Sequence, residues 1–142
     1  MTWKKSPLVG RHTLWALGLA IVMLAAPSAW SAEEITIEIA PSTLNIQSNG
    51  KVVTVHTDIA YSHIDVYTVY LEGVAINSWK ADDRGNFVAK FLTDEIKGIS
   101  GLVINDYNTL KFVALTTYAE PVSVWGEADV MVIDSGTGGN AE

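Results

Sequence analysis

The sequence predicts an all-β fold, a single antiparallel β-sandwich of about seven to eight strands with one short helical turn. Short runs that alternate between apolar and polar residues recur along the chain, and turn residues separate them roughly every eight to twelve positions. One stretch, residues 80–91, joins an acidic turn directly to a strand of clean alternation. These observations favour a sandwich, and a small closed barrel is the alternative architecture.

Residues 1–31 have the features of a cleavable secretory signal peptide. Three basic residues precede the apolar run 14–26, and small residues follow it. The run is shorter than the roughly 20 residues that a membrane span needs. We therefore expect cleavage after Ser31, a domain over residues 32–133, and a periplasmic or secreted protein whose mature form has no membrane span.

The composition limits what the mature chain binds. Removing residues 1–31 takes away three of the nine basic residues and none of the sixteen acidic ones, which leaves a net charge of −10. Such a surface repels nucleic acid and anionic lipid and favours cations or basic partners. The chain has no cysteine, which excludes disulfides, thiol catalysis and cysteine-ligated metal centres.

The mature chain begins with a predicted strand and a predicted hairpin. Residues 33–40 place three isoleucines on one face, and Pro41 interrupts the run. Residues 43–48 and 51–59 then alternate on either side of Asn49-Gly50. This dipeptide is typical of a type I′ hairpin turn, in which both central residues have φ > 0.

Residues 60–67 predict a loop, which leads into a second hairpin. The strands 68–71 and 74–79 flank Glu72-Gly73, in which the glycine supplies the permissive backbone. The acidic turn 82–85 follows, and Gly85 is again free to adopt φ > 0. It enters the alternating strand that ends at Phe91.

The last third of the chain predicts one helical turn and two strands. Residues 93–98 form the helical turn, with Thr93 as its N-cap, and residues 99–108 are irregular. Strands 110–117 and 122–133 follow, and Gly126 within the second predicts a bulge or bend. Residues 134–142 are Gly-rich and predict a disordered tail.

This succession of turns resembles bacterial immunoglobulin-like modules of the fibronectin-like type. The resemblance rests on the hairpin 68–76, on the Asp-Asp-Arg-Gly-Asn-Phe turn within 80–87, and on the strand 108–112. It covers most of residues 35–133 and implies an immunoglobulin-like β-sandwich. Such modules occur in extracellular and periplasmic proteins and share no catalytic residues, so the resemblance assigns none to this chain.

One candidate site lies at an end of the sandwich. An immunoglobulin-like order brings the connections 58–65, 82–85 and 118–121 together there. These connections supply carboxylates for a calcium hypothesis, since Ca²⁺ requires oxygen ligands from several loops: Asp58, Asp65, Asp82, Asp83 and Glu120. The alternative is that the acidic residues serve only their own turns. No other cofactor is expected.

Aromatic side chains predict a platform for a sugar ring or a protein partner. Trp125 shares a strand face with Met131, Glu127 and Asp129, so we expect it to be partly exposed. The alternative is that one tryptophan fills the core. The aromatic candidates are Trp79, Trp125, Tyr61, Tyr67, Tyr70 and Tyr118, and the predicted partner-binding set is Trp125, Tyr61, Tyr118 and His63.

Two other features are weaker candidates. His56 lies in mid-strand and is expected to face solvent, so the histidines predict no transition-metal site. The first strand, 33–40, can pair with the open edge of a neighbour and form a homo-oligomer. The alternative is an ordinary first strand within its own chain, whose exposed edge Glu38 and Pro41 protect.

The sequence contains no catalytic motif such as a nucleophile elbow, a zinc-binding His-Glu-x-x-His or a phosphate loop. The primary hypothesis is therefore an exported, non-catalytic binding module that recognises an envelope or secreted protein or a glycan. One alternative is a self-associating structural subunit assembled through its edge strands. Another is a calcium-stabilised accessory domain.

Overall fold

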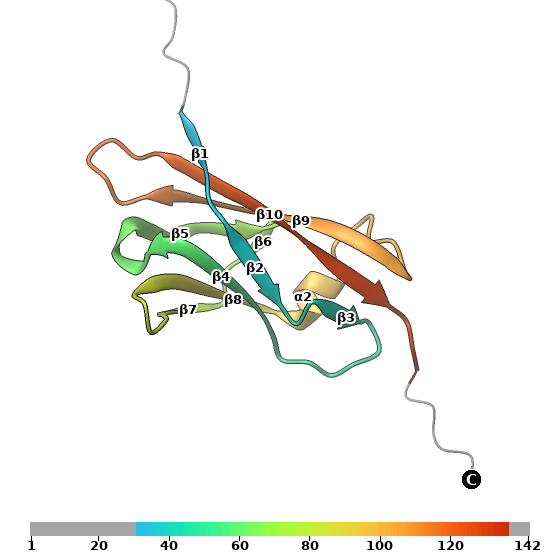
Figure 1. Ribbon diagram of the computed structural model, residues 1–142. Helices are drawn as coiled ribbons and strands as arrows, with labels where there is room; N and C mark the ends of the chain where they lie inside the picture. The colour runs from blue at the N-terminus through green and yellow to red at the C-terminus, as the bar shows by residue number, and fades with distance from the viewer. Residues whose placement is uncertain (1–30, 137–142) are drawn as a thin grey trace, which may run out of the picture.

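The computed structural model describes residues 31–136, which form two packed β-sheets (Figure 1). Sheet A has the strand order β1-β10-β9-β5-β6, with β3 also pairing with β10, and sheet B has the order β2-β4-β8-β7. The elements in chain order are β1 (Ala32–Glu34), β2 (Ile37–Ala40), β3 (Thr43–Asn45), β4 (Val52–Ala60), η1 (Tyr61–His63), β5 (Ile64–Leu71), β6 (Val74–Ala75), β7 (Ser78–Ala81), β8 (Asn86–Leu92), α2 (Thr93–Lys97), β9 (Asp106–Thr116) and β10 (Ser123–Ile133).

The two-layer, all-β architecture is confirmed, but the strand count is not. Residues 31–136 contain ten strands, because two predicted strands, 33–40 and 74–79, each divide between the two sheets. The prediction of a purely antiparallel arrangement is also wrong, since β1 and β3 both run parallel to β10. No helix within residues 31–136 is long and apolar enough to cross a membrane.

The core lies between the sheets and is built from alternate residues of the central strands. Phe87 and Phe91 of β8 face Phe112 of β9, and all three side chains are fully buried. Each such burial stabilises the fold by about 1.5–3 kcal/mol. Ile96 of α2 is also fully buried, so the single helical turn covers the core at one end.

The N-terminal segment passes from sheet A to sheet B and back, as the blue-to-teal ribbon in Figure 1 shows. It crosses β10 at Gly126, where a Cβ atom would lie 2.7 Å from the Ile35 carbonyl oxygen and 2.9 Å from Cγ2 of Ile37. Of the predicted bulge or bend at Gly126, the bulge is wrong, because β9 and β10 pair without a register shift from Ser123 to Val132. The glycine instead permits the close approach of a second backbone.

The predicted Asn49-Gly50 hairpin is also wrong. β3 lies in sheet A and β4 in sheet B, and Gly50 does not have a positive φ. The physical reason is that both sides of β4 are already occupied, by β2 and by β8. Leu44 is buried beside β10 instead, and the residues after β3 connect the two sheets.

The other two turns are confirmed. Glu72 and Gly73 both have positive φ, 46° and 83°, and they join β5 to β6. Gly85 has φ 82° in the turn between β7 and β8. Each of these turns contains a position with positive φ, which glycine adopts without the steric cost that other residues meet.

Three further local predictions need correction. The predicted loop 60–67 is mostly regular, because only η1 separates β4 from β5. The irregular region 99–108 is shorter than predicted, since β9 begins at Asp106. Thr93 is not an N-cap: Leu92 holds that position, and the Thr93 hydroxyl is buried without a hydrogen-bond partner.

The predicted terminal segments fall mostly outside the described residues. Of the predicted signal peptide, only Ser31 is described, and of the predicted tail, only residues 134–136. These three residues have no regular secondary structure. Ser135 accepts a hydrogen bond from the Asn45 side-chain amide through its carbonyl oxygen, at 3.0 Å.

Candidate functional site

Three connections meet at one end of the sandwich, on the left in Figure 1, in agreement with the predicted strand order. The backbone N–H of Tyr61 donates to the carbonyl of Gly85 at 2.9 Å, which joins η1 to the β7–β8 turn. The N–H of Thr117 donates to the carbonyl of His63 at 3.0 Å, which joins η1 to the β9–β10 connection. η1 therefore lies between the other two connections.

The predicted calcium ligands at this end do not converge. Asp58 Oδ1 accepts from the Thr36 N–H at 3.0 Å, and Asp65 Oδ1 accepts from the Tyr67 N–H at 3.1 Å. Asp58, Asp82 and Asp83 line one hollow, whereas Asp65 lies on sheet A opposite Leu115. Within the described residues, no three His, Cys, Asp or Glu side chains are arranged to hold a metal ion.

The remaining predicted ligand, Glu120, lies in the β9–β10 connection and is exposed. It does not line the hollow that contains Asp58, Asp82 and Asp83. The five carboxylates are thus divided among three places, and the geometry lends the calcium hypothesis no support.

Asp82 is bound to its own turn. Its Oδ1 atom accepts hydrogen bonds from the backbone N–H groups of Arg84, at 2.8 Å, and Asn86, at 2.9 Å. The Asn86 hydrogen bond is the largest cause that lowers the pKa of Asp82; the Arg84 N–H and the charges of Arg84 and His56 add to it, while burial opposes it. Asp82 is consequently a charged residue whose Oδ1 atom stabilises its own turn.

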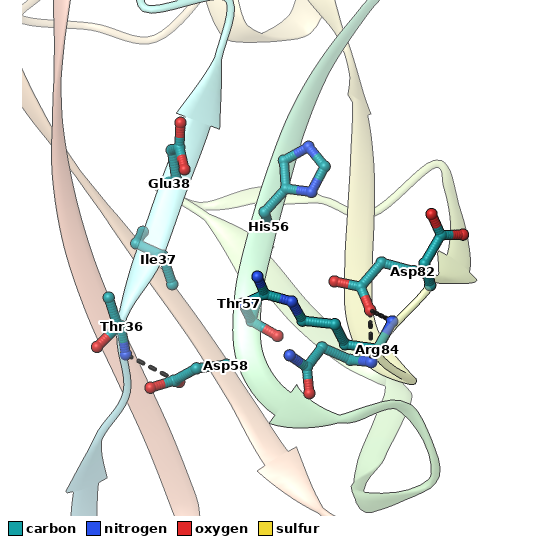
Figure 2. Close-up of a pocket in the computed structure, with 10 residues that line it drawn as sticks. Thr36, Ile37, Glu38, His56, Thr57, Asp58, Asp82 and Arg84 are labelled. Atoms are coloured by element: carbon teal, nitrogen blue, oxygen red, sulfur yellow. Dashed lines mark hydrogen bonds between the residues drawn. The ribbon is translucent and has the colours of Figure 1, made fainter.

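The hollow over sheet B has a volume of about 460 Å³ and carries charges of both signs (Figure 2). Glu38 of β2 and His56 of β4 are directly opposite one another. Figure 2 shows the Arg84 side chain extending from the turn back toward β4. The lining has four carboxylates against one guanidinium and His56, so the hollow is net acidic.

Two of the predicted partner-binding residues form a pair at the loop end. The Tyr118 hydroxyl lies 3.2 Å from Nδ1 of His63, and the two rings are T-shaped with centroids 5.2 Å apart. Tyr61 packs instead against the buried Phe87 ring, at a centroid distance of 6.1 Å. The Tyr61 ring therefore shields the core residue Phe87 from solvent on one side.

The fourth predicted residue, Trp125, lies on the outer face of sheet A, the face that period-two alternation predicts. Val113 of β9 is directly opposite Trp125, and Tyr70 of β5 is directly opposite Val113. Trp125 and Val113 are half-buried, and Tyr70 is 41% exposed. We call these three residues, which lie side by side across three strands, the aromatic band.

The aromatic band has a cation over its tryptophan and carboxylates around it. Lys111 Nζ lies 5.0 Å from the centroid of the Trp125 ring. Glu34 of β1 is directly opposite Trp125, and Glu127 of β10 is directly opposite Lys111. In the described part of the chain the one ion pair joins Lys97 to Asp94, on α2, so neither glutamate has a cationic partner within 4.0 Å.

Trp79, the other tryptophan of the domain, does not belong to the aromatic band. It lies on the edge strand β7 of sheet B, opposite the buried Ala89, and is 38% exposed. The sequence analysis missed Val113 and Lys111. Period two could have identified both, because they alternate with the buried Phe112 and Leu110.

Comparison of this chain with protein-family models, with curated proteins and with solved structures found no match. Function is therefore inferred from the two surfaces alone. The lining of the sheet B hollow is net acidic and contains no tryptophan or tyrosine. The aromatic band combines partly exposed apolar side chains with carboxylates that have no cationic partner within 4.0 Å, which is the chemistry of a recognition surface.

Proposed function

We propose that this chain is an exported, non-catalytic binding module that recognises an envelope or secreted protein or a glycan through the outer face of sheet A. The observation that carries the proposal is the aromatic band, in which Trp125, Val113 and Tyr70 are aligned across β10, β9 and β5. Contiguous exposed apolar surface on a small domain marks an interaction site. Tryptophan and tyrosine are also the side chains that most often dominate binding energy.

The strand order supports an immunoglobulin-like assignment for the module. Immunoglobulin sandwiches place strands A, B, E and D in one sheet and strands C, F and G in the other. The orders β2-β4-β8-β7 and β5-β9-β10 correspond to these two sets. The short β6 beside β5 occupies the place of the additional strand that follows C in variable-type domains.

Export is supported by where the first strand begins. β1 starts at Ala32 and pairs with β10 from that residue onward. Cleavage after Ser31 would therefore leave intact every strand that the structure describes. The leader-like features of residues 1–31 and the strongly acidic mature chain fit a protein that works outside the cytoplasm.

Paired binding measurements on immobilised glycans and extracellular proteins test the proposal. The parent is compared with Trp125→Ala, and Trp79→Ala is the matched control because Trp79 is partly exposed on the other sheet. Truncation of a central tryptophan costs about 2 kcal/mol or more, roughly a thirtyfold loss of affinity. We expect at least one ligand that Trp79→Ala retains and Trp125→Ala loses. Equal retention of every ligand by both variants contradicts the proposal.

Self-association through the first strand is the weaker proposal. β1 pairs with β10 and β2 pairs with β4 within one chain. On sheet B the other edge is β7, which is four residues long, carries Lys80 and leads into an acidic turn. Short, charged edges disfavour strand addition. Light scattering should therefore give the mass of a monomer, and a concentration-independent dimer would favour the structural alternative.

A further inference from the structure

We propose that the partner of the aromatic band is a protein segment with basic side chains around an apolar centre, and that Trp125 receives an arginine of that segment. The inference rests on the proposed function of the same face and specifies which class of ligand it takes. Three observations carry it: the charge of the face, the environment of the Trp125 ring, and the apolar row beside the ring.

The outer face and rim of sheet A are strongly acidic. Lys111 is the one basic side chain there among the described residues, and the other basic residues lie on sheet B, on α2 or in connections. The carboxylates come from β1, β5, β10 and the β5–β6 turn: Glu34, Asp65, Glu72, Glu127 and Asp129. Three of them already accept hydrogen bonds from this sheet: Glu72 from the Lys111 N–H at 2.9 Å, Asp129 from the Thr109 hydroxyl at 2.6 Å and Asp65 from the Tyr67 N–H at 3.1 Å.

The Trp125 ring is arranged to hold a cation. Lys111 Nζ, at 5.0 Å from the ring centroid, occupies a cation–π position. Glu34 and Glu127 flank the same ring, one on the neighbouring strand and one two residues along β10. A guanidinium stacks on an indole and pairs with carboxylates at the same time, and it is less strongly hydrated than an ammonium. A partner's arginine can therefore replace Lys111, whose flexible side chain can turn to Glu127, its cross-strand neighbour.

The apolar centre of the surface lies beside this position. Val113 is half-buried between Trp125 and Tyr70, and Leu115, two residues along β9, is half-buried on the same face. An apolar core surrounded by a charged rim is the usual anatomy of a protein interface. The surface therefore selects a segment in which basic and apolar residues are interleaved.

The same observations disfavour the other occupants. A neutral sugar ring that replaced Lys111 over the Trp125 ring would bring no positive charge to the flanking Glu34 and Glu127, whereas an arginine would. A second copy of this chain would present its own carboxylates to these carboxylates in a two-fold contact, and like charges that meet across an interface are strongly unfavourable.

A nuclear magnetic resonance titration tests the inference. The isotopically labelled protein, purified after expression of the full chain, is titrated with three synthetic peptides of equal length, in which arginine alternates with leucine, arginine with serine, or glutamate with leucine. We expect the arginine–leucine peptide to shift the Trp125 indole N–H and the amides of β9 and β10. The other two peptides should bind roughly tenfold more weakly. The arginine–serine peptide lacks the apolar side chains, and the glutamate–leucine peptide lacks the basic ones.

Variants of the protein test the roles of the ring and the carboxylates. Trp125→Leu keeps an apolar side chain but removes the ring, and should weaken binding of the arginine–leucine peptide by about tenfold. Glu34→Gln combined with Glu127→Gln should weaken it by roughly three- to tenfold and reduce its dependence on salt. The matched control is Glu38→Gln, on the outer face of sheet B, which should leave the affinity unchanged.

Four outcomes overturn the inference. If the arginine–leucine peptide shifts only the sheet B hollow around Glu38 and His56, the site is wrong. If the arginine–serine peptide binds equally well, the attraction is charge alone. If a neutral β-1,4-linked glucose oligomer shifts the Trp125 indole and the arginine–leucine peptide does not, the ligand is a glycan, and the proposed function stands without this inference. The absence of shifts on sheet A with every probe overturns both.

Discussion

Replacement of Gly126 by alanine tests the crossing of the N-terminal segment over β10. The new Cβ would lie 2.7 Å from the Ile35 carbonyl oxygen. That oxygen cannot move alone, because the Thr36 N–H of the same peptide unit donates to Asp58 Oδ1 at 3.0 Å and the Ile35 N–H of the preceding unit donates to the carbonyl of Trp125 at 2.8 Å. The segment must shift as a unit, and the same shift would move Glu34 away from Trp125.

The expected loss of stability follows from two opposing contributions. Overpacking costs about 1–3 kcal/mol, and the upper part of that range applies because the obstructing atom belongs to the backbone. The lower conformational entropy of the unfolded alanine chain offsets about 0.4–1 kcal/mol. We expect Gly126→Ala to lower the free energy of unfolding by about 2 kcal/mol, and the Tm by roughly 8–16 °C.

Urea denaturation followed by circular dichroism measures this loss, with the slope of the transition expected to remain unchanged. The control is Gly136→Ala, since a Cβ at Gly136 has no heavy atom within 4 Å. It should change the stability by less than about 0.5 kcal/mol. If Gly126→Ala were as stable as Gly136→Ala, Ile35 would not lie against β10 and the account of the N-terminal segment would be refuted.

Three further results are expected. Asp82→Ala should lower the Tm at pH 7, because the turn loses the two hydrogen bonds that the Asp82 carboxylate accepts from its backbone. The pKa of Asp82 in the folded state lies below its usual value of 3.8. The stability that the charged carboxylate contributes is therefore fully present above pH 3.8 and is lost as the pH falls through the folded pKa. The difference in Tm from the parent should therefore be larger at pH 7 than at pH 2, with Asp83→Ala as the control. Thr93→Val should raise the free energy of unfolding by about 1 kcal/mol in urea titrations, because the buried Thr93 hydroxyl has no partner; a decrease would show that the hydroxyl is satisfied. The intact mass of the exported protein should correspond to a chain that begins at Ala32, and a mass that retains residues 1–31 would contradict cleavage.

Turns that depend on the φ of one residue could be predicted from the sequence. The choice of pairing partner among strands that are distant in the sequence could not. The turns at Gly73 and Gly85 were predicted because each needs a positive φ whatever surrounds it. Asn49-Gly50 carries the same local preference, yet the hairpin does not form because β2 and β8 occupy both sides of β4. The alternation of residues 33–40 was correct, but both sheets face one core, so the pattern fits either sheet and could not reveal the crossing at Gly126.

The candidate site was predictable in part for a similar reason. The side of β10 on which Trp125 lies follows from period two alone. Its neighbours Val113 and Tyr70 follow only from the register of three strands, and the pairing of β5 with β9 shifts between Asp65 and Tyr70. The acidic residues were predicted at the correct end of the sandwich. The sequence could not show that Asp82 binds its own turn, because a turn carboxylate and a metal ligand are the same residue type.

Photo-crosslinking in the organism of origin is the most direct test of the central claim, that sheet A binds a basic protein segment. A photoreactive amino acid replaces Val113, at the centre of the aromatic band, and a control places it at Thr54, on β4 of sheet B. We predict an adduct from position 113 alone, with a different polypeptide whose crosslinked segment contains arginine or lysine next to apolar residues. An adduct that forms equally from position 54, or one that joins two copies of this chain, would contradict the claim.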